Sequence, residues 1–104
     1  MRRPVALDPA AERDVAETAR WYRDIRQDLA EAFVRALDVG LARISRMPDA
    51  YTQVAPDVRR ILLGRYPFAL YYMVDPEEIA VIACLHVHRD PGVWKQRAEL
   101  HGEE

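Results

Sequence analysis

The chain has 104 residues, a formal net charge of −2 and a single cysteine. This length suits one domain over residues 1–104, and one cysteine excludes an internal disulfide. No apolar run approaches the roughly 20 residues that a membrane span requires, and the opening residues do not form a signal-peptide core. A slightly acidic chain is a poor general nucleic-acid binder, because such proteins are usually strongly basic. We therefore expect a cytoplasmic protein that does not contact a membrane.

The first half of the chain predicts a short strand and two helices. Val5–Leu7 is expected to form the strand. Asp8 and Pro9 indicate a helix start, since aspartate is a good N-cap and a proline there loses no hydrogen bond. This helix should end near Arg26, and its expected buried face consists of Ala11, Val15, Ala19 and Tyr22.

A second helix should begin near Asp28 and end at Pro48. Its expected buried stripe consists of Leu29, Phe33, Leu37, Gly40, Ile44 and Met47. A glycine inside a helix costs about 1 kcal/mol relative to alanine. We therefore expect Gly40 to allow close approach of the first helix, which predicts a helical hairpin.

The second half of the chain predicts three strands joined by short turns. They are Val58–Leu63, Phe68–Val74 and Ile79–His88. Such short connections require antiparallel pairing of these strands. After the last strand, Val93–Leu100 is expected to form one or two helical turns. The expected fold is α+β in the order β-α-α-β-β-β, a helical hairpin packed on a twisted antiparallel sheet with a short helical tail.

The last strand has two faces of different character. The face expected to cover the helices consists of Ile79, Val81, Ala83, Leu85 and Val87. The opposite face consists of Ala80, Ile82, Cys84, His86 and His88, and it becomes polar toward the end of the strand, where we expect a site. The shared direction of Cys84, His86 and His88 raises the question of zinc. No fourth ligand is evident for a structural zinc ion, so we expect no metal and no cofactor.

Several short segments, taken in order, resemble ParE-like members of the RelE/ParE toxins, from about Val5 to Arg97. They are Asp8-Pro9-Ala10-Ala11, Ala19-Arg20-Trp21-Tyr22, Ile44 to Pro48 with Tyr51, Val58-Arg59-Arg60, Arg65-Tyr66-Pro67-Phe68, Leu70-Tyr71-Tyr72, and His86 to Pro91 with Trp94 and Arg97. The resemblance implies a helical hairpin on a twisted antiparallel sheet. It also implies neutralisation by a small antitoxin whose C-terminal segment wraps the toxin.

The resemblance leaves two activities open: cleavage of messenger RNA on the ribosome and poisoning of DNA gyrase. The positions that match RelE-like nucleases are only partly filled, because Leu62 is apolar and Ala69 replaces an arginine. Trp94 stands in place of a terminal tyrosine, and an indole N–H is no general acid at neutral pH. If the chain were a nuclease, its catalytic residues would be Arg60, His86, His88 and Arg89.

We therefore expect a noncatalytic toxin that inhibits gyrase, without a small-molecule substrate. The remaining alternatives are the ribosome-dependent nuclease and a non-toxic relative that serves as a binding module. Arginines and aromatic side chains are the usual anchors of protein interfaces. The expected target-binding residues are Arg59, Arg60, Arg65, His88, Arg89 and Trp94. Each of them has a structural alternative, such as Trp94 pinning the tail onto the sheet.

The antitoxin is expected in a groove between the hairpin and the sheet. Its expected contacts are the apolar residues Trp21, Tyr22, Phe33 and Leu41, with Arg59 and Arg60 receiving acidic side chains. This arrangement predicts that the free toxin exposes an apolar patch.

Overall fold

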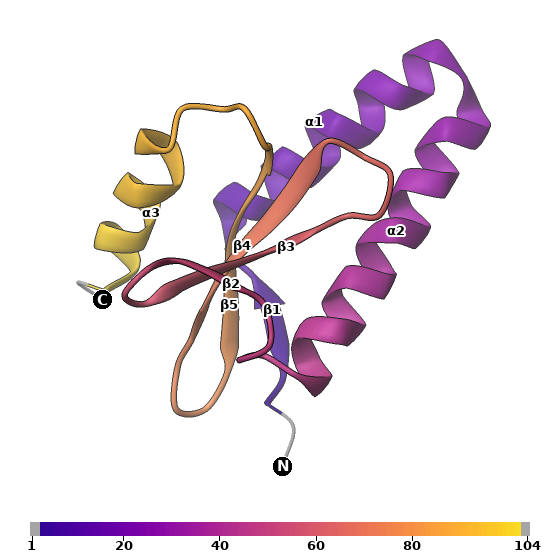
Figure 1. Ribbon diagram of the computed structural model, residues 1–104. Coiled ribbons are helices and arrows are strands. Elements are labelled where there is room, and N and C mark those ends of the chain that lie inside the picture. Colours follow the sequence, from indigo (N-terminus) through magenta and orange to yellow (C-terminus); the bar gives the residue numbers. More distant parts are fainter. Residues whose placement is uncertain (1–2, 103–104) are drawn as a thin grey trace.

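The computed structural model describes residues 3–102. One sheet lies between two helical layers (Figure 1). The elements are β1 (Val5–Leu7), α1 (Pro9–Ile25), α2 (Gln27–Arg46), β2 (Thr52–Ala55), β3 (Val58–Leu62), β4 (Phe68–Val74), β5 (Ile79–His86) and α3 (Gly92–Gly102). Helices α1 and α2 form a hairpin on one face of the sheet, and α3 lies on the other face. The predicted α+β class is confirmed, whereas the edge strand β2 was not predicted.

The sheet has the strand order β1-β5-β4-β3-β2. The pairs β2–β3, β3–β4 and β4–β5 are antiparallel, as the short connections require. The expectation of a wholly antiparallel sheet is wrong, because β1 lies parallel to β5. The whole hairpin and three strands separate β1 from β5 along the chain, so no tight turn determines their relative direction.

The hairpin packs its apolar stripes onto the sheet as the helical spacing predicted. The predicted face of α1 and the side chains of Phe33, Leu37 and Ile44 on α2 contribute to the core between hairpin and sheet, the hairpin core. Two predicted residues differ: Leu29 is only partly buried and lies outside the hairpin core, and Met47 is exposed because it is the C-cap residue, after the last helical residue.

Gly40 faces the sheet rather than the first helix. A Cβ atom at this position would lie 2.8 Å from Leu63 Cδ2 and 3.4 Å from Leu70 Cδ1. Leu63 and Leu70 are both fully buried. The close approach that this glycine allows is therefore between α2 and the strands, which corrects our expectation.

A β-bulge in β5 reverses which residues face the hairpin. Tyr72 pairs with Val81 while Tyr71 pairs with Ala83, so Ile82 is the extra residue. Before the bulge, Ile79 and Val81 lie in the hairpin core as predicted. After it, Cys84 lies in the hairpin core, whereas Ala83 and Leu85 lie in the core beneath α3. Our assignment of faces is therefore wrong beyond Ile82, and the strand ends at His86, before His88.

Helix α3 is longer than the one or two turns that we expected, and it closes a second core. Its Trp94 ring stacks on Tyr71, with 5.4 Å between ring centroids and an interplanar angle of 15°. The sheet side of this α3 core includes the buried residues Val58, Met73 and Leu85. The sheet is therefore buried on both faces along β4 and β5.

Candidate functional site

An ion pair braces the middle of β5, at its bulge. The Asp14 carboxylate of α1 accepts hydrogen bonds from the Cys84 backbone N–H (3.0 Å) and from the Arg97 guanidinium (2.5 and 3.2 Å). Arg97 also donates to the Ile82 carbonyl (3.1 Å). A bulge leaves backbone groups without ladder partners, and these two side chains satisfy them.

Sequence reasoning missed this pair. The available signal was the spacing of Asp14 with Thr18 and Trp21, which places a carboxylate on a helix face that continues into apolar residues. The structure shows that Asp14 on this face bonds to both β5 and α3, and so links the three elements.

The two histidines of β5 stay together at the end of the strand. The His86 ring lies 5.5 Å from that of Phe68 and 5.4 Å from that of His88. The His88 backbone N–H donates to His86 Nδ1 (3.1 Å). His86 is half-buried, whereas His88 and Arg89 are exposed in the loop that leads to α3. This end of the strand is thus polar and accessible.

The predicted target-binding arginines do not form one patch. Arg59 pairs across the sheet with Tyr72 on the hairpin side, and Arg60 pairs with Tyr71 on the α3 side. Arg59 also donates to the Tyr51 carbonyl (2.8 Å), so at least part of its role is structural. Arg65, in the β3–β4 turn, and Arg89 are exposed.

Two residues that we expected to contact partners are buried. Phe33 is 0% exposed and Trp94 is 6% exposed. Neither side chain offers a surface to an antitoxin or a target, so the hairpin core and the α3 core remove both from the predicted binding sets. Tyr22 and Leu41 are half-buried against the hairpin core.

Trp21 is the predicted antitoxin contact with the most accessible side chain, at 60% exposed. Ile25, which we did not predict, follows one helical turn later and is 58% exposed. The signal for Ile25 was its i+4 spacing from Trp21.

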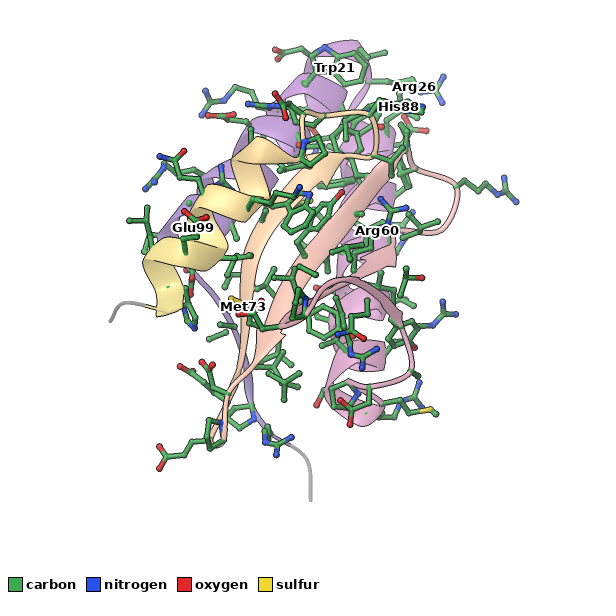
Figure 2. All side chains as sticks on the ribbon, turned by 60° about the vertical axis from the view of Figure 1, so that its left-hand side comes forward. Trp21, Arg26, Arg60, Met73, His88 and Glu99 are labelled. Carbon is green, nitrogen blue, oxygen red and sulfur yellow. The ribbon has the colours of Figure 1, made fainter. Side chains whose placement is uncertain are left out.

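The residues of the alternative nuclease set are divided between the two faces of the sheet. Directly opposed residues of an antiparallel pair lie on the same face. His86 pairs with Phe68, which packs on Phe33 of the hairpin, whereas Arg60 pairs with Tyr71 beneath α3. Figure 2 shows Arg60 partway along the sheet and His88 at the end near the tip of the hairpin.

The cysteine of β5 is buried and is not activated as a nucleophile. Burial, together with the charge of Asp14, raises the pKa of the Cys84 thiol to about 12, which disfavours the reactive thiolate. Within residues 3–102, no three His, Cys, Asp or Glu side chains gather in a way that could hold a metal ion.

Comparisons with known proteins agree with this fold. One solved structure, described as the chromosomal ParDE TA system from P. aeruginosa, superposes with a TM-score of 0.65 at 16% sequence identity. The match covers 82% of this chain and 96% of the other, and at this identity it shows the fold alone. A search among curated proteins found no relative.

A family model gives the more specific match. It describes the ParE toxin of the type II toxin–antitoxin system parDE and matches residues 5–91, most of the chain. In the part of the chain that the structure describes, no helix is long and apolar enough to cross a membrane. The chain belongs to the ParE toxin family of type II toxin–antitoxin systems.

Proposed function

We propose that this ParE-family toxin acts in the cytoplasm by binding DNA gyrase and that it catalyses no reaction of its own. The observation that carries this proposal is the separation of Arg60 from His86 by the thickness of the sheet. RNA cleavage through the 2′-OH needs a base, an acid and a cation around one phosphate. Residues on opposite faces of a sheet cannot converge on that phosphate.

Binding without chemistry requires only accessible anchors. Arg65, His88 and Arg89 are exposed at the end of the sheet near the hairpin tip, where the β3–β4 turn and the β5–α3 loop meet solvent. Arginine is a frequent interface anchor because its planar guanidinium makes several hydrogen bonds at once. These three residues are the proposed contacts with gyrase or with the DNA that gyrase holds.

The antitoxin is the second proposed partner, and it follows from membership of a two-component family. The solved structure with the same fold is described as a ParDE toxin–antitoxin system. We propose a cognate antitoxin that binds the toxin in a hetero-oligomer and prevents its action.

The test compares two reactions with the purified full-length chain. Gyrase with plasmid DNA and ATP should accumulate cleaved DNA when the chain is added, and an Arg65→Ala, Arg89→Ala double variant should need about tenfold more protein for the same effect. Arg35→Ala, an exposed arginine in the middle of α2, is the matched control and should behave as the wild-type chain does.

The second reaction is messenger RNA cleavage on programmed ribosomes, with Arg60→Ala and His88→Ala variants. We expect no cleavage. Cleavage that depends on both residues would show that the chain is a nuclease and would refute the proposal. Inactivity in both reactions, with normal growth on induction, would favour a non-toxic binding module.

A further inference from the structure

The loop between β5 and α3 carries two of the proposed target contacts, His88 and Arg89, and its first three backbone N–H groups donate hydrogen bonds. The Val87 N–H donates to the Pro67 carbonyl (2.9 Å). The Arg89 N–H donates to the His86 carbonyl (2.9 Å). The His88 N–H donates instead to a side chain, at the Nδ1 atom of His86 (3.1 Å). Of these three acceptors, only the imidazole can change its protonation state.

The His86 ring is held in place by aromatic side chains on the hairpin side of the sheet. Its centroid lies 5.5 Å from that of Phe68, and the two rings meet at 75°, an edge-to-face arrangement that aromatic rings favour. Phe68 in turn contacts the rings of Tyr22 (6.2 Å) and Phe33 (6.0 Å), and Phe33 is fully buried. The hairpin core therefore sets the position of the acceptor nitrogen to which the loop is bonded.

Only a neutral imidazole can accept this hydrogen bond. The neutral ring has one nitrogen without a proton, whereas an imidazolium carries a proton on both nitrogens and can only donate. Protonation of His86 therefore places two N–H donors against each other, where one nitrogen now accepts at 3.1 Å. Imidazole is the side chain that ordinarily changes its charge between about pH 5 and 8. Acidification thus removes the acceptor that the His88 N–H uses.

Charged side chains of both signs lie on the elements around His86. They are Asp14, Glu17 and Asp24 of α1, Arg65 of the β3–β4 turn, and His88, Arg89 and Asp90 of the loop. Among the described residues, none of them forms an ion pair with His86. Asp14 is paired with Arg97, and Asp90 accepts a hydrogen bond from the Gly92 backbone N–H (2.8 Å). In this arrangement of residues 3–102, a protonated His86 gains no salt bridge that would replace the lost hydrogen bond.

We infer that His86 is a positioning residue for the target contacts: its neutral imidazole holds the β5–α3 loop, and its protonation releases His88 and Arg89 from the conformation that engages the target. The inference rests on the proposed function, which places both residues in the target interface. It adds pH regulation to that interface, because the loop is held less tightly as the pH falls through the range in which imidazole titrates.

The first test measures hydrogen exchange of the residue 88 amide in the full-length chain, relative to an unstructured peptide at the same pH. Protection of this amide should fall by about fivefold from about pH 7.5 to about pH 5.5, the effect of losing one ordinary hydrogen bond. His86→Asn keeps an acceptor oxygen near the position of Nδ1 and does not titrate, so its protection should stay constant. His86→Leu has no acceptor, so its protection should be low at both pH values.

Two further variants identify the titrating group. His88→Asn retains the backbone N–H and should retain the pH dependence of the wild-type chain. His101→Asn, at the far end of α3, should retain it as well. A pH dependence that disappears in His88→Asn but persists in His86→Asn would overturn the inference. Wild-type protection that does not change with pH would overturn it too, and His86→Asn decides the matter even if His86→Leu fails to fold.

The gyrase reaction tests the consequence for the target. The ratio of wild-type to His86→Asn activity at the same pH cancels the pH dependence of gyrase itself. This ratio should be near one at about pH 7.5 and lower at about pH 6. A constant ratio would overturn the role of His86 in target binding. Inactivity of both chains would refute the proposed target, while the exchange measurement would still decide whether His86 holds the loop.

Discussion

Asp14 and Arg97 lie 83 residues apart in the chain and meet at the bulge of β5. Both side chains are mostly shielded from solvent, at 11% and 23% exposed. The Asp14 carboxylate also receives the Cys84 N–H, so one side chain serves α1, β5 and α3. A shielded pair of this kind is costly to break, because removing one partner leaves the other group desolvated and unpaired.

We predict that Asp14→Ala lowers the free energy of unfolding by about 3 kcal/mol in urea titrations, because it strands both Arg97 and the Cys84 N–H. Asp14→Asn should fall between this variant and wild type, since the amide oxygen can still accept one hydrogen bond. Asp28→Ala is the control: its pair with Arg26 is exposed, so the midpoint should hardly change. Equal losses in both alanine variants would contradict the role of Asp14 at the bulge.

Two buried acidic groups, the Cys84 thiol and the Tyr72 hydroxyl, make the free energy of unfolding depend on pH in the alkaline range. Burial is the largest cause that raises the pKa of each, from 9.0 for Cys84 and from 10.0 for Tyr72, to about 12. A group whose pKa is raised on folding stabilises the fold fully below its unfolded pKa, and this stability is lost as the pH rises toward the folded pKa. The loss should therefore begin near pH 9 for Cys84 and near pH 10 for Tyr72.

We predict that the free energy of unfolding falls between pH 9 and 10 by at most about 1.4 kcal/mol, owing mainly to Cys84. Cys84→Ala should remove most of this slope while keeping the decline above pH 10 that Tyr72 causes. Urea titrations at half-unit intervals from pH 8 to 10.5 measure both. An unchanged slope between pH 9 and 10 in Cys84→Ala would show that another group titrates.

At the scale of elements, one aromatic side chain supplies the largest apolar contact of α3 with the sheet. Trp94 stacks on Tyr71 and fills the core on that face of the sheet. The other large apolar residue of the helix, Leu100, is 57% exposed. At the end of α3, His101 lies 3.0 Å from Asp75 and 3.4 Å from Asp8, which ties the helix to the β4–β5 turn and to the start of α1.

Trp94→Ala is predicted to lower the free energy of unfolding by about 3 kcal/mol, the usual cost of truncating a buried aromatic residue. Leu100→Ala truncates an apolar side chain of the same helix and should cost less than about 0.5 kcal/mol, because that side chain is already in water. Urea titrations of both variants against wild type provide the comparison. A cost for Trp94→Ala as small as that for Leu100→Ala would mean that the α3 core contributes little to stability.

The whole molecule has two apolar cores that share the strands β4 and β5. Alternate residues of β4 point into opposite cores: Leu70 and Tyr72 face the hairpin, and Tyr71 and Met73 face α3. Loss of either core removes the packing from one side of the same strands. We therefore expect one cooperative transition in place of stepwise loss of α3 and the hairpin.

The two tryptophans test this because they report on different sides of the sheet. In Trp94→Phe the remaining indole, Trp21, lies on the hairpin, and in Trp21→Phe the remaining indole lies beneath α3. For each variant, the urea midpoint from fluorescence should coincide with the midpoint from far-ultraviolet circular dichroism. An earlier fluorescence transition in Trp21→Phe would show that α3 unfolds independently.

The amino-acid sequence by itself determined the elements that depend on local periodicity. The helical spacing of Ala11, Val15, Ala19 and Tyr22 and the capping positions around Pro9 and Pro48 placed both helices, because a helix face is set by residues within a few turns. The resemblance of ordered segments to ParE-like toxins predicted the arrangement of the helices on the sheet and the class of toxin. The family match confirms this class.

Only the tertiary structure decided which side chains are exposed to a partner and on which face of the sheet they lie. The bulge at Ile82 depends on register with β4, a non-local property, and it alone moved His86 to the face opposite Arg60. The two tryptophans were alike in sequence as candidate anchors, yet Trp94 is buried and Trp21 is exposed. The reason is physical: burial depends on what packs above a residue, and here α3 lies over Tyr71 while α1 extends past the end of β5.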